Sequence, residues 1–243
     1  MTEKAKVVSY YQELSKTYDK KRLSTEKSKI ISDLQTDWFV KNLENTAAIV
    51  CLEIGCGTGR LTKELIKKAR ILVATDTSPE MIKINKNKMP QPLQKNKIHY
   101  VICDTAHLPF HNKTFTNIAS ARVFWHIQDY PQVLKETIRV LNKNGSLLFD
   151  FPCLWGPFSL YSKFRGIKHD VLSLFVDRKT IKQIFKKNQN LAIHGNTSMI
   201  LYFVPDKLLK IKAIKKAICL LEITNKTFLK NWLYTYYLIK VTK

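Results

Sequence analysis

Residues 50–60 of this 243-residue chain read VCLEIGCGTGR, an apolar run with an acid near its end, followed by three alternate glycines. A short apolar run that ends in glycines predicts a buried strand and a turn. Glycine at such positions lets a ligand approach the backbone more closely than a side chain would allow. Leu61, Leu65 and Ile66 then recur at helical spacing. We therefore predict a strand, a glycine loop and a helix, which is a nucleotide-binding arrangement.

The details of the loop exclude two kinds of nucleotide site. A dinucleotide fingerprint is G-x-G-x-x-G, whereas Gly55, Gly57 and Gly59 form G-x-G-x-G. A phosphate-binding P-loop requires G-K-[ST], which does not follow here. Glu53 lies just upstream, and its carboxylate would repel a pyrophosphate but could hold a cationic amino group. The ligand that fits has a nucleoside at one end and an amino acid at the other.

The segment resembles motif I of the class I S-adenosylmethionine-dependent methyltransferases, whose usual form is acidic-x-G-x-G-x-G. The resemblance implies that S-adenosyl-L-methionine is the cofactor. A tight turn with incidental glycines is the alternative interpretation of the loop alone. The resemblance assigns five residues of the segment to cofactor binding, namely Glu53, Gly55, Cys56, Gly57 and Gly59.

Two later apolar runs also end in carboxylates. Asp76 ends the run ILVATD and lies about 20 residues beyond the loop, where an acid can bond both ribose hydroxyls of a nucleotide. The next helix is predicted to begin at Pro79, with Ser78 as its N-cap. Asp104 ends a third run, IHYVICD. We expect these acids to lie near the glycine loop, at the carboxyl ends of neighbouring strands.

These runs resemble motifs II and III of the same family. The resemblance implies that Asp76 binds the ribose, that Met81 packs near the adenine, and that Asp104 meets the adenine amino group. Thr77 and Thr105, which follow the two acids, are carried over with them as cofactor contacts. A helix cap is the alternative role for Asp76.

Further strands predicted at residues 116–123 and 146–151 bring the number of strands that alternate with helices to five. Such alternation predicts an α/β fold with a doubly wound, mostly parallel, Rossmann-like sheet. The helix between these two strands is expected to stop at Asn144 and Gly145. Residues 232–241 resemble the antiparallel final strand of the family. Three further elements are expected after the fifth strand: a helix over residues 176–187, and short strands near 191–193 and 198–204.

The predicted organisation has two parts. Residues 1–45 form a helical N-terminal lid, and residues 46–243 form the methyltransferase domain, with its core at 50–151 and substrate-side additions at 152–231. Around Tyr18 the lid resembles the Y-x-x-x-A-x-x-Y-D segment of the small-molecule, ubiquinone/menaquinone-biosynthesis group (methyltransferase type 11). That resemblance implies that Tyr18 contacts the cofactor, although Ser15 replaces the usual alanine. An amphipathic packing helix is the alternative.

Candidate acceptor-binding residues follow strands four and five. The stretch FWHIQD looks like the h-x-H-h-x-D stretch of the family, which makes His126 a candidate catalytic base or substrate-orienting group. A histidine satisfied at a helix start is the alternative. Arg122 and Trp125 are candidate contacts beside it. Trp155 and Tyr161 are expected to wall an apolar substrate pocket, unless their loop merely covers a hydrophobic cluster.

The formal net charge of +22 favours a polyanionic partner, so nucleic acid is considered as a partner. Against it, only seven of the 41 basic residues are arginine, and lysine is poorer at bidentate phosphate recognition. Residues 207–218 predict a basic amphipathic helix, with Lys212, Lys215 and Lys216 on one face. Such a helix could lie on an anionic membrane surface as a peripheral contact, or be a lid with a solvated face.

Together these features predict a methyltransferase that acts on a small-molecule or lipid-like acceptor. The alternatives are an RNA (tRNA or rRNA) methyltransferase and a non-catalytic, cofactor-binding subunit of a methyltransferase complex. Strand four lacks the [DNS]-P-P-[YF] motif of base amino-methyltransferases. The scattered cysteines predict neither a metal site nor disulfides. With no signal-peptide-like or membrane-spanning apolar stretch, the expected location is cytoplasmic.

Overall fold

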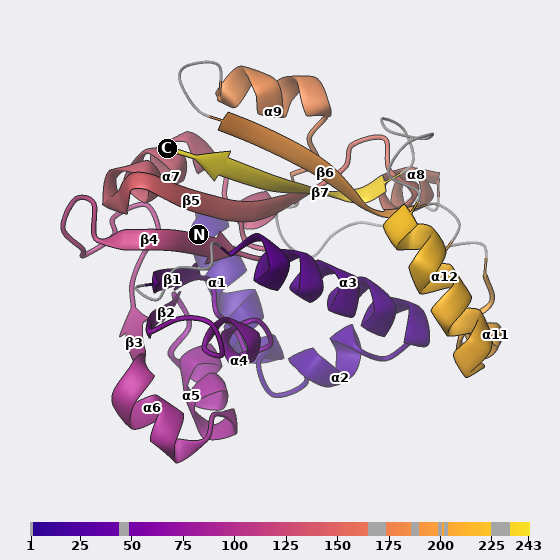
Figure 1. Cartoon of the computed structure of the whole chain (residues 1–243), viewed down its shortest axis with the longest axis horizontal. Helices are drawn as coiled ribbons and strands as arrows, with labels where there is room; N and C mark the ends of the chain where they lie inside the picture. Colours follow the sequence, from indigo (N-terminus) through magenta and orange to yellow (C-terminus); the bar gives the residue numbers. More distant parts are fainter. Residues whose placement is uncertain are drawn as a thin grey trace.

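The computed structural model describes residues 2–43, 49–164, 174–185, 190–198, 201, 204–224 and 234–243. Within these ranges, seven strands form one sheet in the order β3-β2-β1-β4-β5-β7-β6 (Figure 1). The order reverses between β1 and β4, and ligands bind at such a switch point in open α/β sheets. The strands are β1 Val50–Ile54, β2 Ile71–Asp76, β3 Ile98–Ile102, β4 Phe115–Ser120, β5 Leu141–Pro152, β6 Asn190–Ser198 and β7 Tyr234–Thr242.

The first five strands are parallel, and β7 is antiparallel to both of its neighbours, β5 and β6. The register aligns the ends of the strands, since Glu53 in β1 pairs with Ala74 in β2 and Ala119 in β4. The predicted doubly wound, Rossmann-like sheet with an antiparallel final strand is therefore confirmed.

Side chains alternate between the two faces of the sheet, as the period-2 geometry of a strand requires. Leu147 and Phe149 of β5 face a core cluster closed by α7 and α9, whereas Leu148 faces a cluster closed by α3, α4 and α5. Helices thus cover both faces (Figure 1). The helices are α1 Glu3–Leu14, α2 Tyr18–Arg22, α3 Glu26–Asn42, α4 Thr62–Leu65, α5 Pro79–Lys88, α6 Gln91–Lys97, η1 Phe124–His126, α7 Tyr130–Val140, α8 Pro157–Phe164, α9 Arg178–Ile184, α11 Asp206–Leu209 and α12 Lys212–Thr224.

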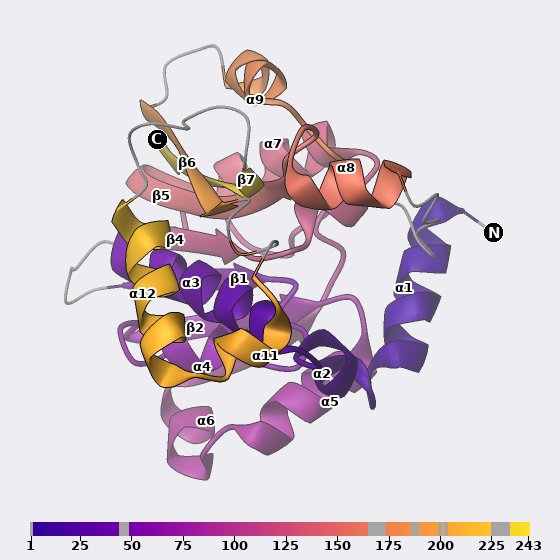
Figure 2. The same ribbon diagram turned by 90° about the vertical axis from the view of Figure 1, so that its right-hand side faces the viewer.

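The N-terminal helices differ in how they are held. Helix α3 packs on the sheet through the fully buried Phe39, and Ile30 and Ile31 pack against Leu209 of α11 and Ile218 of α12. Helix α1 has no buried residue and lies along one side of the molecule (Figure 2). Among the described residues, no helix has the length and apolar character needed to cross a membrane.

The Asn144–Gly145 signal was misread as a helix end. Helix α7 ends at Val140, and β5 begins at the next residue. Asn144 adopts a positive φ of 62°, and its N–H donates to the carbonyl of Lys243 over 2.9 Å. The two residues therefore form an irregularity in β5 that pairs with the end of the chain.

Two predictions after the fifth strand also differ from the structure. The strand expected near residues 198–204 is not found among the described residues of that segment, since Ser198 ends β6 and Leu201 is helical; residues 199–200 and 202–203 lie outside the described residues. The expected helix over residues 207–218 is divided into α11 and α12. Ile211 falls at the division and is 50% exposed, rather than on a buried apolar face. The predicted helix 176–187 appears as α9, with residues 186–187 outside the described ranges.

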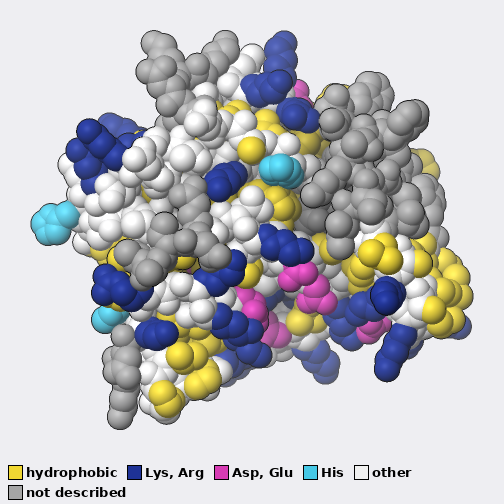
Figure 3. Space-filling view, viewed as in Figure 1, with side chains coloured by type: hydrophobic (Ala, Val, Ile, Leu, Met, Phe, Trp, Pro, Cys, Tyr) yellow, Lys and Arg dark blue, Asp and Glu magenta, His cyan; other side chains and the backbone are white. Residues whose placement is uncertain are grey.

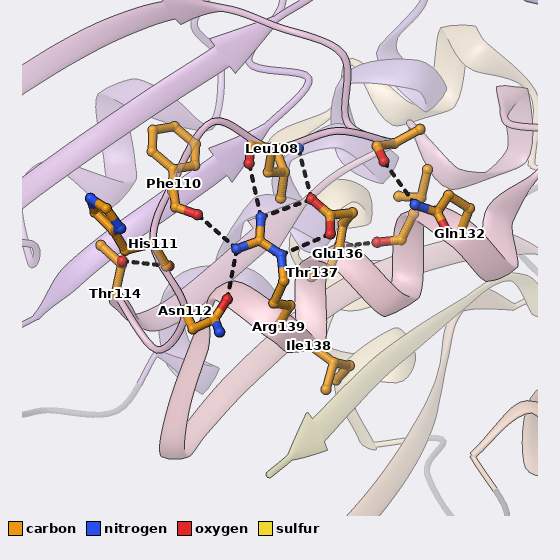
Figure 4. Close-up of polar contacts among 12 residues, drawn as sticks. Leu108, Phe110, His111, Asn112, Thr114, Gln132, Glu136, Thr137, Ile138 and Arg139 are labelled. Atoms are coloured by element: carbon orange, nitrogen blue, oxygen red, sulfur yellow. Dashed lines mark hydrogen bonds and ion pairs between the residues drawn. The ribbon is translucent and has the colours of Figure 1, made fainter.

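One arginine fixes the loop that follows β3. The guanidinium of Arg139, on α7, donates to the carbonyl of Leu108 over 2.9 Å, to that of Phe110 over 2.8 Å and to Oδ1 of Asn112 over 2.9 Å (Figure 4). Two further bonds of 2.8 Å join it to Glu136, which in turn accepts the N–H of Leu108 over 2.9 Å. The pair thereby holds the segment after Asp104, which borders the site.

Replacing Arg139 with glutamine should therefore destabilise the fold, because two carbonyls lose their charged donor. We expect a fall in Tm of about 2–4 °C, which corresponds to roughly 1 kcal/mol in a domain of this size. Thermal unfolding measured by circular dichroism checks this, with Arg70→Gln as the control, since Arg70 is exposed. An equal Tm in both variants would contradict the anchoring role.

Candidate functional site

A cavity of about 320 Å³ opens where β1, β2 and β4 end. Its floor comes from the loops after these strands and its cover from α1. The volume falls near the lower end of ligand pockets, which range over roughly 300–1,000 Å³. Its lining includes Lys4, Val7, Val8, Tyr11, Tyr18, Gly55, Gly57, Asp76, Thr77, Met81, Asp104, Thr105, Arg122, Val123, Ile127 and His126.

Two glycines let the floor approach both its neighbour and the cavity. Gly55 has a φ of 68°, and a Cβ placed there would lie 2.2 Å from a methyl carbon of Val123, which follows β4. Gly57 has a φ of 50°, and a Cβ there would meet no atom within 4 Å. Gly57 therefore presents bare backbone to the cavity, in a left-handed conformation that favours glycine.

Asp76 connects this loop to the start of the next helix. Its Oδ2 accepts the N–H of Gly57 over 2.8 Å, and its Oδ1 accepts the N–H of Ser78 over 2.9 Å. Ser78 caps α5 as predicted, and Pro79 is the first residue of that helix. Burial raises the pKa of Asp76, against the lowering effect of these N–H donors. Each carboxylate oxygen has a second lone pair with which it can accept from a ligand in the cavity.

Glu53 lies beneath the loop instead of pointing into it. The side chain is 2% exposed, and its Oε2 accepts the hydroxyl of Thr62 over 2.6 Å. Thr62 accepts the amide of Asn85 over 2.9 Å, whose Oδ1 accepts the hydroxyl of Tyr100 over 3.2 Å. Burial raises the pKa of Glu53 to about 8. The carboxyl therefore anchors α4 and α5 under the loop, and it is not among the residues that line the cavity.

Asp104 contacts α1, the first helix of the N-terminal lid. Lys4 of α1 forms a short ion pair with its Oδ2, and the N–H of Ala106 donates to its Oδ1 over 3.1 Å. Burial alone would raise the pKa of Asp104, but the bonds from Lys4, Ala106 and His107 outweigh it and lower the pKa. The carboxylate is therefore ionised and lies at the contact between the cavity and α1.

His126 and Tyr11 both line the cavity and are in direct contact with each other. The Tyr11 hydroxyl lies 2.7 Å from Nε2 of His126, and the two rings meet edge to face, with centroids 5.3 Å apart. Burial raises the pKa of Tyr11, and the electrostatic interaction with Tyr18 adds to the effect. The phenol therefore stays protonated and can donate to the imidazole.

A second contact joins the lid to the glycine loop. Asp19, at the start of α2, accepts the hydroxyl of Thr58 over 2.6 Å and pairs with Lys88 of α5. Lys88 also donates to the carbonyl of Thr58 over 3.3 Å. Tyr18, the neighbour of Asp19, lines the cavity as predicted. The Tyr18–Asp19 dipeptide thus places one side chain in the cavity and the other on the loop.

The structure brings ten of the predicted site residues to the cavity and, among those whose side chains it describes, leaves five away from it. Glu53, Cys56 and Gly59 lie within or under the loop, and Trp125 packs between His126 and Tyr236. Trp155 is 54% exposed. Tyr161 belongs to α8, but its side chain lies outside the described residues. The ten at the cavity are Tyr18, Gly55, Gly57, Asp76, Thr77, Met81, Asp104, Thr105, Arg122 and His126.

Sequence reasoning missed Lys4, Tyr11 and Asp19. Lys4 and Tyr11 share one face of α1 with Val7 and Val8, at the spacing of a helical stripe. That spacing is visible in the sequence and selects Tyr11 over Tyr10. Tyr10 is not a cavity-lining residue and packs against the Tyr11 ring at 5.3 Å.

Comparison with known proteins decides the family. Residues 52–149 match the family described as a methyltransferase domain. A demethylmenaquinone methyltransferase of Lactococcus lactis subsp. lactis is 27% identical over 231 residues, which is 82% of this chain and 88% of that protein. Residues 52–149 therefore carry a methyltransferase domain of the class I, S-adenosylmethionine-dependent type.

Two further proteins resemble this methyltransferase. An uncharacterized protein of Methanocaldococcus jannaschii is 32% identical over 147 residues, which is 60% of this chain and 52% of that protein. The chain thus spans about half the length of that relative. A crystal structure from Thermotoga maritima, titled a possible histamine N-methyltransferase, has a TM-score of 0.66 and 15% identity, over 96% of this chain and 98% of that chain. At that identity the likeness concerns the fold.

The cavity of this methyltransferase fits S-adenosyl-L-methionine. Gly57 leaves open space beside its backbone, and the Asp76 carboxylate borders the same space. The amino-acid end of the cofactor would lie along Gly55 and Gly57, and its ribose would bind to Asp76. The adenine would contact Asp104, Thr105 and Met81. The cofactor would supply an electrophilic methyl group on its sulfonium.

The burial of Glu53 makes the stability of the protein depend on pH. Its pKa is raised in the folded state from 4.5 to about 8, so its stabilising effect is lost as pH rises through this window. Glutamine stays neutral and can still accept from Thr62. We expect Glu53→Gln to become more stable than the wild type between pH 6 and pH 9, by about 1 kcal/mol or more, the equivalent of one pKa unit. Urea unfolding at several pH values checks this; a pH-independent difference would contradict the buried ionisation.

Proposed function

We propose that this chain transfers a methyl group from S-adenosyl-L-methionine to a small-molecule or lipid-like acceptor. Methyl transfer is an in-line displacement, so positioning of the acceptor atom is the principal task of the protein. Three acidic or glycine-rich strand ends would fix the cofactor, and the remaining space under α1 would hold the acceptor.

The observation that carries this proposal is the cover over the cavity. Helix α1 contributes Val7, Val8 and Tyr11 to the lining, and its Lys4 pairs with Asp104. Apolar side chains from the opposite wall, among them Val123 and Ile127, face those of the helix and complete the enclosure. A cover of this kind suits a small acceptor, whereas a folded RNA would have to displace the helix.

His126 and Tyr11 are the residues best placed to act on the acceptor. With Tyr11 as donor to Nε2, the imidazole carries its proton on Nδ1, and the Nε2 lone pair faces the Tyr11 hydroxyl. Nε2 is then the basic nitrogen of the ring, so it can take a proton from a hydroxyl or an acidic carbon of the acceptor when that group replaces the Tyr11 hydroxyl as its partner. Until then Tyr11 orients the ring. The same contact holds α1 against η1, so the lid and the proposed base are linked.

Cofactor binding tests the first part of the proposal. Asp76→Ala removes both a ribose partner and the acceptor that holds the Gly57 N–H, so affinity for S-adenosylhomocysteine should fall at least about tenfold. Isothermal titration calorimetry measures it. Asp37→Ala, an exposed acid on α3, is the matched control and should bind as the wild type does. Unchanged affinity in the Asp76 variant would count against the assignment.

Turnover tests the second part. His126→Asn should lower kcat by about 10²-fold or more, the usual contribution of a general base, while leaving cofactor affinity within twofold. Tyr11→Phe should lower kcat less, because the ring still packs on His126. Tyr10→Phe, on the same helix but away from the lining, is the control. If His126→Asn kept full activity, the histidine would have a packing role only.

The acceptor class is tested with labelled cofactor. Among the described residues, Lys and Arg side chains are spread over the face seen in Figure 3 rather than gathered in one stripe, so these residues form no continuous basic track there. Purified protein with labelled S-adenosyl-L-methionine and a cell extract should label small molecules or lipids. Label in RNA would favour the nucleic-acid alternative, and no label would favour a non-catalytic subunit.

A further inference from the structure

Three of the seven arginines in this lysine-rich chain come together beside the cavity. Arg22 ends α2, Arg60 precedes α4, and Arg122 follows β4 and lines the cavity. Burial is the largest cause of a lowered pKa for Arg22, and the charge of Arg122 adds to it. Burial together with Arg22 and Arg122 lowers the pKa of Arg60 to about 9. The fold brings three positively charged side chains from distant segments of the chain into one region with little access to solvent.

No carboxylate of the described residues neutralises this cluster directly. Asp150 of β5 is the nearby acid, but its Oδ1 accepts the backbone N–H of Arg122 over 2.6 Å, and its Oδ2 accepts the side-chain amide of Gln35. Arg60 donates to neutral acceptors, including Oε1 of Gln35 over 3.1 Å and the carbonyl of Ser32 over 3.1 Å. The cluster therefore keeps an excess of positive charge.

Two of the arginines have guanidinium nitrogens without a hydrogen-bond acceptor among the described residues. Nη1 of Arg22 donates to the hydroxyl of Tyr18 over 3.0 Å, while Nε and Nη2 are buried without a partner. Nε of Arg122 donates to Gln35 over 3.0 Å, and its guanidinium lies over the Tyr236 ring at 5.5 Å. Within the described residues, the terminal nitrogens of Arg122 have no hydrogen-bond acceptor.

A third unpartnered donor lies beside the same aromatic ring. Nε1 of Trp125 is buried and lacks a partner among the described residues. The Trp125 ring packs edge to face on Tyr236 with centroids 5.9 Å apart, and it lies tilted against the His126 ring with centroids 4.8 Å apart. Buried polar groups without partners are costly, and every one of these groups is a donor. A ligand that satisfies them must supply acceptors and negative charge.

We propose that Arg22, Arg122 and Trp125 form a subsite for an oxyanion, a carboxylate or a phosphate monoester, carried by the methyl acceptor. The inference rests on the proposed function and narrows its substrate class. Guanidinium pairs are suited to bidentate bonds with such groups. Binding there would place the rest of the acceptor next to His126, which stacks on Trp125.

Small oxyanions test the subsite. The full chain, saturated with S-adenosylhomocysteine, is titrated with inorganic phosphate and separately with acetate, with sodium chloride matching the ionic strength. Wild type should gain Tm with at least one probe beyond the chloride reference. A response to phosphate alone assigns a phosphate monoester, and a response to acetate alone assigns a carboxylate.

Three variants decide whether the arginines are responsible. Arg22→Gln and Arg122→Gln should each weaken the apparent affinity for the probe at least fivefold, and Arg70→Gln, an exposed arginine, should leave it unchanged. Arg22→Gln is expected to fold, since it removes buried unpartnered donors and a repulsion. No response in the wild type, or an equal response in the Arg22 and Arg122 variants, would overturn the subsite.

The carboxylate of the cofactor is the competing source of negative charge. Affinities for S-adenosylhomocysteine and for methylthioadenosine, which lacks the amino-acid end, separate the two sources. In Arg122→Gln both affinities should stay within twofold of the wild type. A tenfold loss for S-adenosylhomocysteine alone would assign the arginine to the cofactor and overturn the proposal. Should the wild type bind no S-adenosylhomocysteine, the proposed function fails, while the titrations repeated without it still report on the subsite.

Discussion

The site depends on the carboxylate of Asp76. One of its oxygens holds the N–H of Gly57 and the other holds the N–H of Ser78, so a single side chain fixes the loop after β1 relative to α5. Hydrogen bonds to a charged group contribute about 1.5–3 kcal/mol each, which is enough to hold a glycine loop in one conformation. The carboxylate borders the cavity as well. The same group therefore organises the empty site and is available to a ligand.

The cover is held in a different way. Helix α1 has no buried residue, and its contacts with the site are the Lys4–Asp104 ion pair and the Tyr11–His126 hydrogen bond. Val7 and Val8 line the cavity but are only partly buried, so the helix belongs to the low-stability end of a fold, where segments open locally. Its position depends on contacts with residues that the cofactor and acceptor would also touch. Ligand entry and lid contact thus involve the same side chains.

Many features of the fold and the site could be predicted from the sequence because they depend on local chemistry. Strand, turn and cap signals depend on neighbouring residues, so β1, its glycine loop, Asp76 and the Ser78–Pro79 helix start were correct. The direction of a single side chain was not readable, and Glu53 was expected in the cavity although it lies under the loop. The Asn144–Gly145 pair carried a helix-end signal, but strand pairing with Lys243 overrode it.

Non-local features were beyond the sequence for a physical reason. Arg22, Arg60 and Arg122 are brought together only by the tertiary fold, because they lie at the end of α2, before α4 and after β4. Tyr11 was distinguishable from Tyr10 by the phase of α1, but only once the stripe of Lys4, Val7 and Val8 was known to face a cavity. Both features depend on tertiary contacts between segments far apart in the chain.

The most direct measurement is a crystal structure of the protein soaked with S-adenosylhomocysteine. The account predicts the adenosine between Asp76 and Asp104, the ribose hydroxyls on the Asp76 carboxylate, and the amino-acid end along Gly55 and Gly57. An empty cavity at saturating concentration, or a ligand bound elsewhere with these carboxylates unengaged, would contradict it.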